Sequence, residues 1–213
     1  MKIIYSGGYD KYSKKSISKS MFYRYAGILN EQIEKGKIIA SINFAKPDSY
    51  YNSRLEEIFR DKAIAIDHSN KQIINWGFYD VILLPGGDQN LLKEGLIETG
   101  FAIENLKKNI VIIGDSAGAY VMSSYYPSYD GEVESIDEKN ITNYVEEGLY
   151  KESNVITIAH TNNKSYAPTI AVDITKKLAE KLDVKFLALK ENEEKLLDKS
   201  GELVDFKITD IFK

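Results

Sequence analysis

Short, continuous apolar runs that alternate with helical patterns are the feature that most restricts the fold of this chain. The clearest runs cover residues 81–84, 110–113 and 155–159. A strand that is apolar on both faces must be covered on both faces, which is typical of parallel sheets in α/β proteins. The sequence therefore predicts an α/β fold with a mostly parallel, doubly wound sheet and helices on both faces.

The same patterns predict the remaining elements. Further strands are expected at residues 2–5, 37–44, 63–66 and 185–189, with a small C-terminal hairpin between residues 194 and 211. Helices are expected at residues 17–35, 50–61, 88–108, 117–123 and 168–182. Residues 123–153 have no strong period, which is typical of a functional loop or of a segment that contains short strands.

Composition and charge narrow the classes of function. The chain has 213 residues, of which 43% are hydrophobic and 28% charged, so we expect a single folded domain over residues 1–213. A net charge of −4 argues against nucleic acid as a partner, because phosphate binding needs a basic face. No signal peptide or membrane-spanning run is recognisable, so we expect a cytoplasmic protein without membrane contact.

The chain contains no cysteine and many tyrosines. Without cysteine there is no disulfide, thiolate metal site or cysteine nucleophile. We expect most of the 15 tyrosines to lie at the edge of the core, with a homodimer interface as the alternative.

Residues 114–119, Gly-Asp-Ser-Ala-Gly-Ala, match the G-x-S-x-G pattern of a nucleophile elbow. In that turn the serine stands between a strand and a helix, and the small residues two before and two after it let the backbone pack tightly. We therefore predict that Ser116 is a nucleophile, with an idle serine in a glycine-rich turn as the alternative. Asp115 is expected to point away, because an inward carboxylate would disfavour a nearby oxyanion.

A serine hydroxyl needs a base, and the chain has only two histidines, His68 and His160. His160 ends the apolar run 155–159, and the carboxyl ends of parallel strands form the ligand crevice of such sheets. His68 lies in a polar stretch that is typical of a surface turn. We therefore predict His160 as the base, with a buried, hydrogen-bonded histidine as the alternative.

An acid orients the imidazole in sites of this kind. The carboxylates between Ser116 and His160 are the candidates: Asp130, Glu132, Glu134, Asp137, Glu146 and Glu147. The residues alone do not choose among them, and each one taken singly is more typical of a solvated surface charge.

A second glycine turn, Pro-Gly-Gly-Asp at residues 85–88, follows the apolar run 81–84. Glycines there expose backbone N–H groups to a ligand or an oxyanion, and the Ala117 N–H would supply a second donor. A strand-to-helix turn capped by Asp88 is an equally good and compatible interpretation. The turn at residues 6–8 lacks the lysine and spacing of a phosphate loop, so nucleotide binding is not expected.

At these turns the sequence resembles the peptidase E family of serine peptidases, which includes α-aspartyl dipeptidase and the cyanophycinases. The family pattern G-x-S-A-G-A matches residues 114–119, a glycine turn one strand earlier matches 84–91, and a histidine after a later strand matches 158–162. The resemblance extends over nearly the whole chain. It implies a fold like that of class I glutamine amidotransferases, with serine in place of cysteine at the elbow.

The resemblance also implies roles for individual residues. Ser116 would be the nucleophile and His160 the base, and the backbone N–H groups of Gly87 and Ala117 would bind the oxyanion. The substrate would lie against Gly86, Asp88 and Lys164.

The chain departs from the family in two features: the acid that orients the histidine and the cationic residue that binds the substrate. Asp130 lies fourteen residues after Ser116, close to the family spacing, so it is the first choice for the acid, and Glu132 is the second. The α-aspartyl dipeptidases hold the substrate aspartate with an arginine after the catalytic histidine. Here no arginine follows Arg60, and Lys164 is the candidate, as a point charge without the arginine fork.

The expected function is therefore that of a serine peptidase or dipeptidase that forms an acyl-enzyme and acts on small peptides, with N-terminal aspartate as one candidate. No metal or organic cofactor is expected. An esterase or amidase could use the same residues, and a non-catalytic small-molecule or peptide binding protein could share the fold. A glutamine amidotransferase is disfavoured because it would need a cysteine nucleophile.

Overall fold

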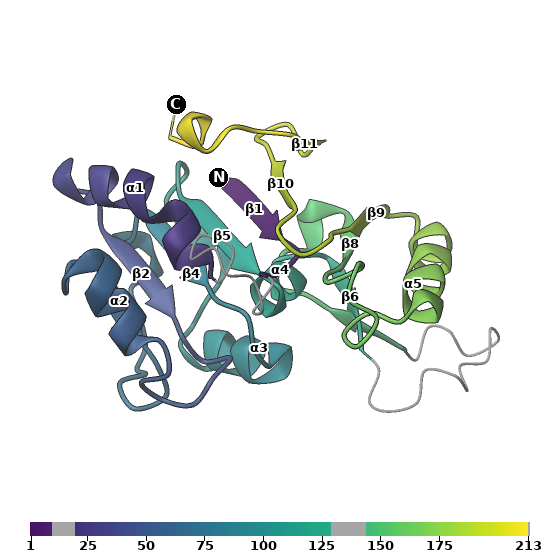
Figure 1. Ribbon diagram of the computed structural model, residues 1–213, viewed down its shortest axis with the longest axis horizontal. Coiled ribbons are helices and arrows are strands. Elements are labelled where there is room, and N and C mark those ends of the chain that lie inside the picture. The colour runs from purple at the N-terminus through teal and green to yellow at the C-terminus, as the bar shows by residue number, and fades with distance from the viewer. Residues whose placement is uncertain (10–19, 129–143, 213) are drawn as a thin grey trace.

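The strands form two sheets in this computed structural model, which describes residues 1–9, 20–128 and 144–212 (Figure 1). The larger sheet contains β1 (Lys2–Ser6), β2 (Ile39–Ile42), β3 (Ile64–Ile66), β4 (Val81–Leu84), β5 (Val111–Asp115), β10 (Glu194–Leu197) and β11 (Leu203–Val204). Its strand order is β11-β10-β1-β5-β4-β2-β3. The five strands from β1 to β3 in this order run parallel, which confirms the predicted α/β class with a mostly parallel sheet.

Helices cover both faces of the larger sheet, as the apolar strands predict (Figure 1). They are α1 (Met21–Glu34), α2 (Asn52–Phe59), α3 (Gln89–Glu98) and α4 (Ala117–Val121). Alternate strand residues point to opposite faces. Ile4, Leu83 and Ile113 share one buried cluster with α1 and α2, whereas Ile82 and Ile112 share another with α3 and α4. The strands are therefore apolar throughout because each face packs against its own pair of helices.

The smaller sheet is the main difference from the single sheet that the sequence suggests. It contains β6 (Tyr125–Pro127), β7 (Val145–Glu147), β8 (Val155–Ile158) and β9 (Lys185–Ala188) in the order β7-β6-β8-β9. Helix α5 (Thr169–Leu182) packs on this sheet through Ala171 and Leu178. β6 and β7 fall within the segment that has no period in the sequence, so the short-strand interpretation of that segment is confirmed for its described part.

The helices are shorter than the sequence predicts, and the difference is largest for α3 and α1. Helix α3 ends at Glu98 and not near Lys108, because Gly100 adopts a φ of 76° and its N–H donates to the Ile97 carbonyl. Helix α1 begins after Ser20, whose hydroxyl accepts the Phe22 N–H at 3.2 Å. Among the described residues, no helix has the length and apolar content needed to cross a membrane.

The C-terminal hairpin is confirmed, and the turns after several strands meet beside it. β10 pairs antiparallel with both β11 and β1, so the hairpin extends the larger sheet beyond β1. The two sheets meet where β1 and β8 end, because the His160 N–H donates to the Gly7 carbonyl at 3.0 Å. This junction brings the turns after β1, β4, β5 and β8 to one place.

Candidate active site

Ser116 lies on a strained turn between β5 and α4, as the elbow pattern predicts. Its φ of 50° and ψ of −102° are unusual for a residue with a side chain. A Cβ at Gly114 would lie 2.5 Å from the Gly118 carbonyl oxygen, and a Cβ at Gly118 would lie 2.1 Å from the Leu84 carbonyl oxygen. The small residues around the serine are therefore required by backbone packing against β4 and within the turn itself.

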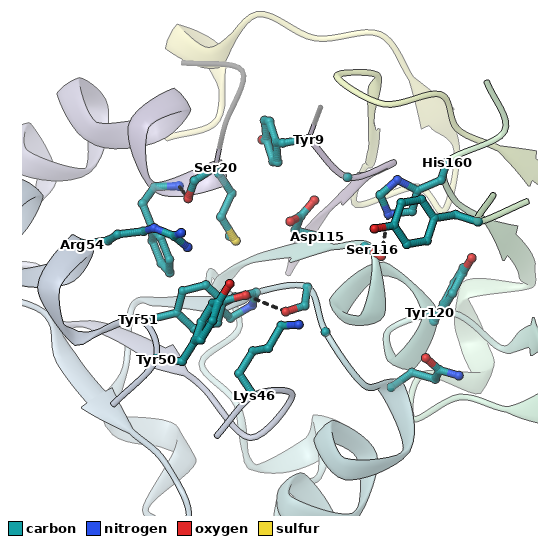
Figure 2. Close-up of a pocket in the computed structure, with 18 of the residues that line it drawn as sticks. Tyr9, Ser20, Lys46, Tyr50, Tyr51, Arg54, Asp115, Ser116, Tyr120 and His160 are labelled. Carbon is teal, nitrogen blue, oxygen red and sulfur yellow. Dashed lines mark hydrogen bonds between the residues drawn. The ribbon is translucent and has the colours of Figure 1, made fainter. Parts of the chain in front are cut away.

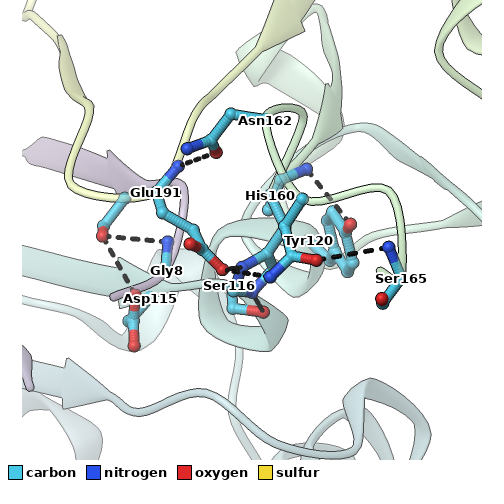
Figure 3. Close-up of polar contacts among 11 residues, drawn as sticks. Gly8, Asp115, Ser116, Tyr120, His160, Asn162, Ser165 and Glu191 are labelled. Atoms are coloured by element: carbon cyan, nitrogen blue, oxygen red, sulfur yellow. Dashed lines mark hydrogen bonds and ion pairs between the residues drawn. The ribbon is translucent and has the colours of Figure 1, made fainter. Parts of the chain in front are cut away.

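His160 lies within hydrogen-bond reach of this serine. Its Nε2 atom is 3.0 Å from the Ser116 Oγ atom (Figure 3). The ring occupies space above Gly8, where a Cβ would lie only 2.1 Å from the His160 Cε1 atom. The lack of a side chain at Gly8 thus leaves the space that the imidazole ring occupies. His68, the other histidine, lies elsewhere, with its Nε2 atom 3.0 Å from the Phe44 carbonyl oxygen.

The carboxylate beside the imidazole is Glu191, which the sequence reasoning did not consider. Its Oε1 atom lies 3.0 Å from His160 Nδ1 and accepts a second hydrogen bond from Asn163 Nδ2 at 3.0 Å. The Glu191 N–H in turn donates to Asn162 Oδ1 at 2.7 Å. The His160 and Glu191 side chains are only 15% and 10% exposed, so their interaction is weakly screened by water.

Asp130 and Glu132, the acids expected from the sequence, lie outside the described residues. A signal for Glu191 is nevertheless present in the sequence. It follows the strand at residues 185–189, and the argument that places His160 at the carboxyl edge of the sheet applies equally to this strand. The prediction considered only carboxylates between Ser116 and His160, and for that reason it omitted Glu191.

The two glycines after β4 and the start of α4 surround the serine. Gly86 and Gly87 line the same pocket as Ser116. Gly87 has a φ of 151°, and a Cβ there would lie 2.1 Å from the Ala45 carbonyl oxygen. The N–H groups of Gly87 and Ala117 have no hydrogen-bond acceptor within the described part of the chain, so both remain available as the donors that the sequence predicts.

Two residues expected to contact substrate do not line this pocket. The Asp88 carboxylate caps α3 by accepting the N–H groups of Asn90 at 2.8 Å and Leu91 at 3.1 Å, so only its helix-capping interpretation is observed. Lys164 is exposed in the turn after His160. That turn presents Tyr166 to the pocket, with its ring 4.8 Å from the His160 ring.

The pocket has a volume of about 420 Å³ and carries positive charge at the end away from His160 (Figure 2). Arg54, on α2, lies over Tyr50 and Tyr51, with its guanidinium carbon 5.5 and 5.7 Å from their ring centres. Lys46 Nζ lies 5.4 Å from the centre of the Tyr50 ring. Neither cation forms an ion pair with another described residue. Their positive charges are therefore available to an anionic group, and sequence reasoning missed both.

Asp115 lines the pocket and does not point away as expected (Figure 2). Its neighbour across the sheet is Ser6, whose hydroxyl donates to Asp115 Oδ1 at 2.9 Å and holds the side chain on this side. Burial raises the pKa of the Asp115 carboxyl to about 7, because the charged form loses hydration. The charge of Glu194 raises this pKa further, whereas hydrogen bonds from Ser6, Gly86 and Gly8 lower it.

Within the described ranges, no three or more histidine or acidic side chains are grouped to hold a metal ion. The site instead contains a serine, an imidazole and a carboxylate in a hydrogen-bonded series, which is the arrangement that activates a hydroxyl nucleophile. No protein-family model matches the chain, and no curated protein shows significant sequence similarity to it.

Proposed function

We propose that this protein is a serine peptidase of the peptidase E type, with a fold like that of class I glutamine amidotransferases and activity on small peptides. The observation that carries the proposal is the Ser116–His160–Glu191 series at a strained elbow open to a pocket. Both hydrogen bonds measure 3.0 Å, which is within the range for a base that accepts the serine proton.

In the proposed reaction, His160 Nε2 takes the Ser116 proton while Oγ attacks the peptide carbonyl carbon. Glu191 holds the Nδ1 proton and stabilises the imidazolium that forms. The carbon–nitrogen bond then breaks, and the imidazolium gives its proton to the leaving amine. Water then attacks the acyl-enzyme while His160 takes its proton, the carbon–Oγ bond breaks, and His160 returns the proton to Ser116 Oγ. The N–H groups of Gly87 and Ala117 stabilise the oxyanion in both steps.

The shape and charge of the pocket support a small substrate with an acidic group. A volume of about 420 Å³ lies at the small end of the range for ligand sites, which suits a dipeptide better than a folded protein. His160 protonates the leaving group, so the acyl part of the substrate extends the other way, toward Arg54 and Lys46 (Figure 2). These two cations take the place that the sequence assigned to Lys164, and they favour an N-terminal residue with a carboxylate side chain.

The main alternative, a non-catalytic binding protein, predicts that the base lies out of reach of the serine. The 3.0 Å distance between His160 Nε2 and Ser116 Oγ favours catalysis instead. An esterase or amidase would use the same atoms, so the bond that is cleaved must be found by assay.

The test is hydrolysis of a panel of dipeptides and aminoacyl amides, with acidic and neutral N-terminal residues, by the wild type and Ser116→Ala. We expect cleavage and labelling by a fluorophosphonate probe in the wild type, and loss of both in the variant. Ser53→Ala is the control, because Ser53 is exposed on α2 and does not line the pocket. If neither protein cleaves any substrate and the probe does not label Ser116, the proposed function is wrong.

A further inference from the structure

The carboxylate of Asp115 has no role in the proposed reaction, although it lies beside the nucleophile. Its Oδ1 atom accepts the Ser6 hydroxyl, and the residue is only partly buried where it lines the pocket. A carboxylate that loses part of its hydration is stabilised by a cationic partner. Asp115 has no ion pair with any cation in the described part of the chain.

The neighbouring charged and polar groups do not supply that partner. Glu194 is already paired with Arg24 Nε at 2.8 Å and accepts the Tyr9 hydroxyl at 2.9 Å. The Tyr51 hydroxyl donates to the Gly86 carbonyl at 2.6 Å. Ser6, Gly8 and Gly86 give Asp115 neutral hydrogen bonds only. Among the described residues, this acidic position is thus without a counter-charge.

Asp115 also lies close enough to the nucleophile to meet the amino group of an α-aminoacyl substrate. A Cβ at Gly86 would lie 3.3 Å from both Asp115 Oδ2 and Ser116 Cβ, so these two atoms are no farther apart than twice that distance. In an α-aminoacyl group the carbonyl carbon and the amino nitrogen are about 2.5 Å apart. When the carbonyl carbon meets Ser116 Oγ, an amino nitrogen on the acyl side therefore comes within reach of Asp115.

We propose that Asp115 binds the free α-ammonium group of the substrate's N-terminal residue and so restricts the enzyme to substrates with an unblocked amino terminus. The inference rests on the proposed function, and it adds a specificity-determining residue to it. In Figure 2, Asp115 lies between the nucleophile and the Arg54 end of the pocket. The acyl residue would then be held at two points, by its ammonium on Asp115 and by an acidic side chain toward Arg54 and Lys46.

The test compares three substrates that share one leaving group: a dipeptide with a free amine, its N-acetyl form, and the analogue in which hydrogen replaces the amine. The last compound controls for the bulk of the acetyl group. We expect wild-type kcat/KM to be at least about tenfold higher for the free amine, the size of effect typical of a charge-assisted hydrogen bond. Asp115→Asn keeps the shape of the side chain and should reduce this preference to about twofold or less.

Ser6→Ala is the matched control, because it removes a hydrogen bond to Asp115 without removing the carboxylate. It should keep the preference for the free amine even if overall activity falls. A merely structural role for Asp115 predicts the opposite, equal losses for all three substrates in both variants. Wild-type enzyme that cleaves the three substrates equally would overturn the inference and leave the serine hydrolase intact.

Binding to Ser116→Ala, measured by calorimetry, separates failure of this inference from failure of the proposed function. The free dipeptide should bind at least about tenfold more tightly than the other two compounds, and Asp115→Asn in the same background should remove the difference. This holds even if no substrate is cleaved. Equal affinities, or a difference that survives Asp115→Asn, would overturn the inference.

Discussion

Replacement of Glu191 by glutamine is the sharpest test of which carboxylate supports His160 in the proposed reaction. Glutamine has the same shape, and its carbonyl oxygen can still accept the hydrogen bonds from His160 Nδ1 and Asn163 Nδ2. The change therefore removes the negative charge and leaves the packing intact. Any large loss of activity then reports the electrostatic contribution of the carboxylate to the imidazolium.

The magnitude follows from the burial of the pair. At 15% and 10% side-chain exposure, the His160–Glu191 interaction is poorly screened, and removing one partner of such a pair costs about 3–5 kcal/mol when the other is charged. In the proposed reaction His160 becomes positively charged when it takes the Ser116 proton, so this cost falls on the transition state. We expect kcat/KM to fall by roughly 10²–10⁴-fold, with little change in folding stability.

The assay is steady-state hydrolysis of the best dipeptide, together with thermal unfolding followed by circular dichroism. Asp130→Asn and Glu132→Gln are the matched controls, because they remove the carboxylates that the sequence favours. Both should keep activity within about threefold of the wild type, because Glu191 already accepts the hydrogen bond from His160 Nδ1. The reasoning would be refuted if Glu191→Gln stayed within threefold of the wild type while Asp130→Asn or Glu132→Gln lost activity.

Three further predictions test the geometry and charges of the site. Gly8→Ala places a methyl group against the His160 ring at a residue with a φ of 90°, so kcat should fall at least about a hundredfold and the free energy of unfolding by about 1–3 kcal/mol. Gly100→Ala is the control, because Gly100 also has a positive φ but faces open space, and this variant should lose stability only. Activity assays and thermal unfolding will check both. Arg54→Ala and Lys46→Ala should each raise KM about tenfold for peptides with an acidic N-terminal side chain and leave KM for neutral peptides unchanged, which a comparison of the two substrate classes will check. Folding raises the pKa of the Asp115 carboxyl to about 7, so on raising the pH this group ionises in the unfolded chain before it ionises in the folded protein. It should therefore lower the free energy of unfolding by up to about 4 kcal/mol as pH rises from 4 to 7. Urea unfolding at pH 4 and pH 7 should show a smaller decrease in this free energy for Asp115→Asn than for the wild type.

The sequence predicts those parts of the fold whose position depends on the residues of one short segment alone. β4 has the bounds expected from its apolar run, because a strand buried on both faces leaves no room for polar residues. The end of α3 was misplaced because residues after Gly100 keep a mixed apolar pattern that also suits the 3₁₀ turn Ile103–Asn105. The second sheet was missed because β6 and β7 have only three residues each, too few to show a period.

Some residues of the candidate site can likewise be predicted from neighbouring residues in the sequence, whereas others depend on how distant segments pack. Ser116 is recognisable because its elbow needs small neighbours that are adjacent in sequence. Glu191 reaches His160 from the turn after β9, and Arg54 reaches the pocket from α2. The only local signal for Glu191 is its place after a strand, and no motif surrounds Arg54. Their places depend on strand order, which the sequence pattern does not specify.

The Asp115 carboxylate adjoins the site where, in the proposed reaction, a negatively charged oxyanion develops. A full negative charge there would oppose attack on the carbonyl, since like charges at short range disfavour each other. With its pKa near 7, the carboxyl of the free protein is only partly ionised at neutral pH, and its burial costs stability. An ammonium group bound to it would supply the missing counter-charge, so the pair would be close to neutral when the oxyanion forms. Asp115→Asn should therefore make the free protein more stable at neutral pH and less selective for a free amino terminus. Urea unfolding and the ratio of kcat/KM values for free and blocked substrates measure these two effects in the one variant. Both effects together indicate a substrate-binding carboxylate, whereas loss of a carboxylate that only supports the fold would destabilise the protein.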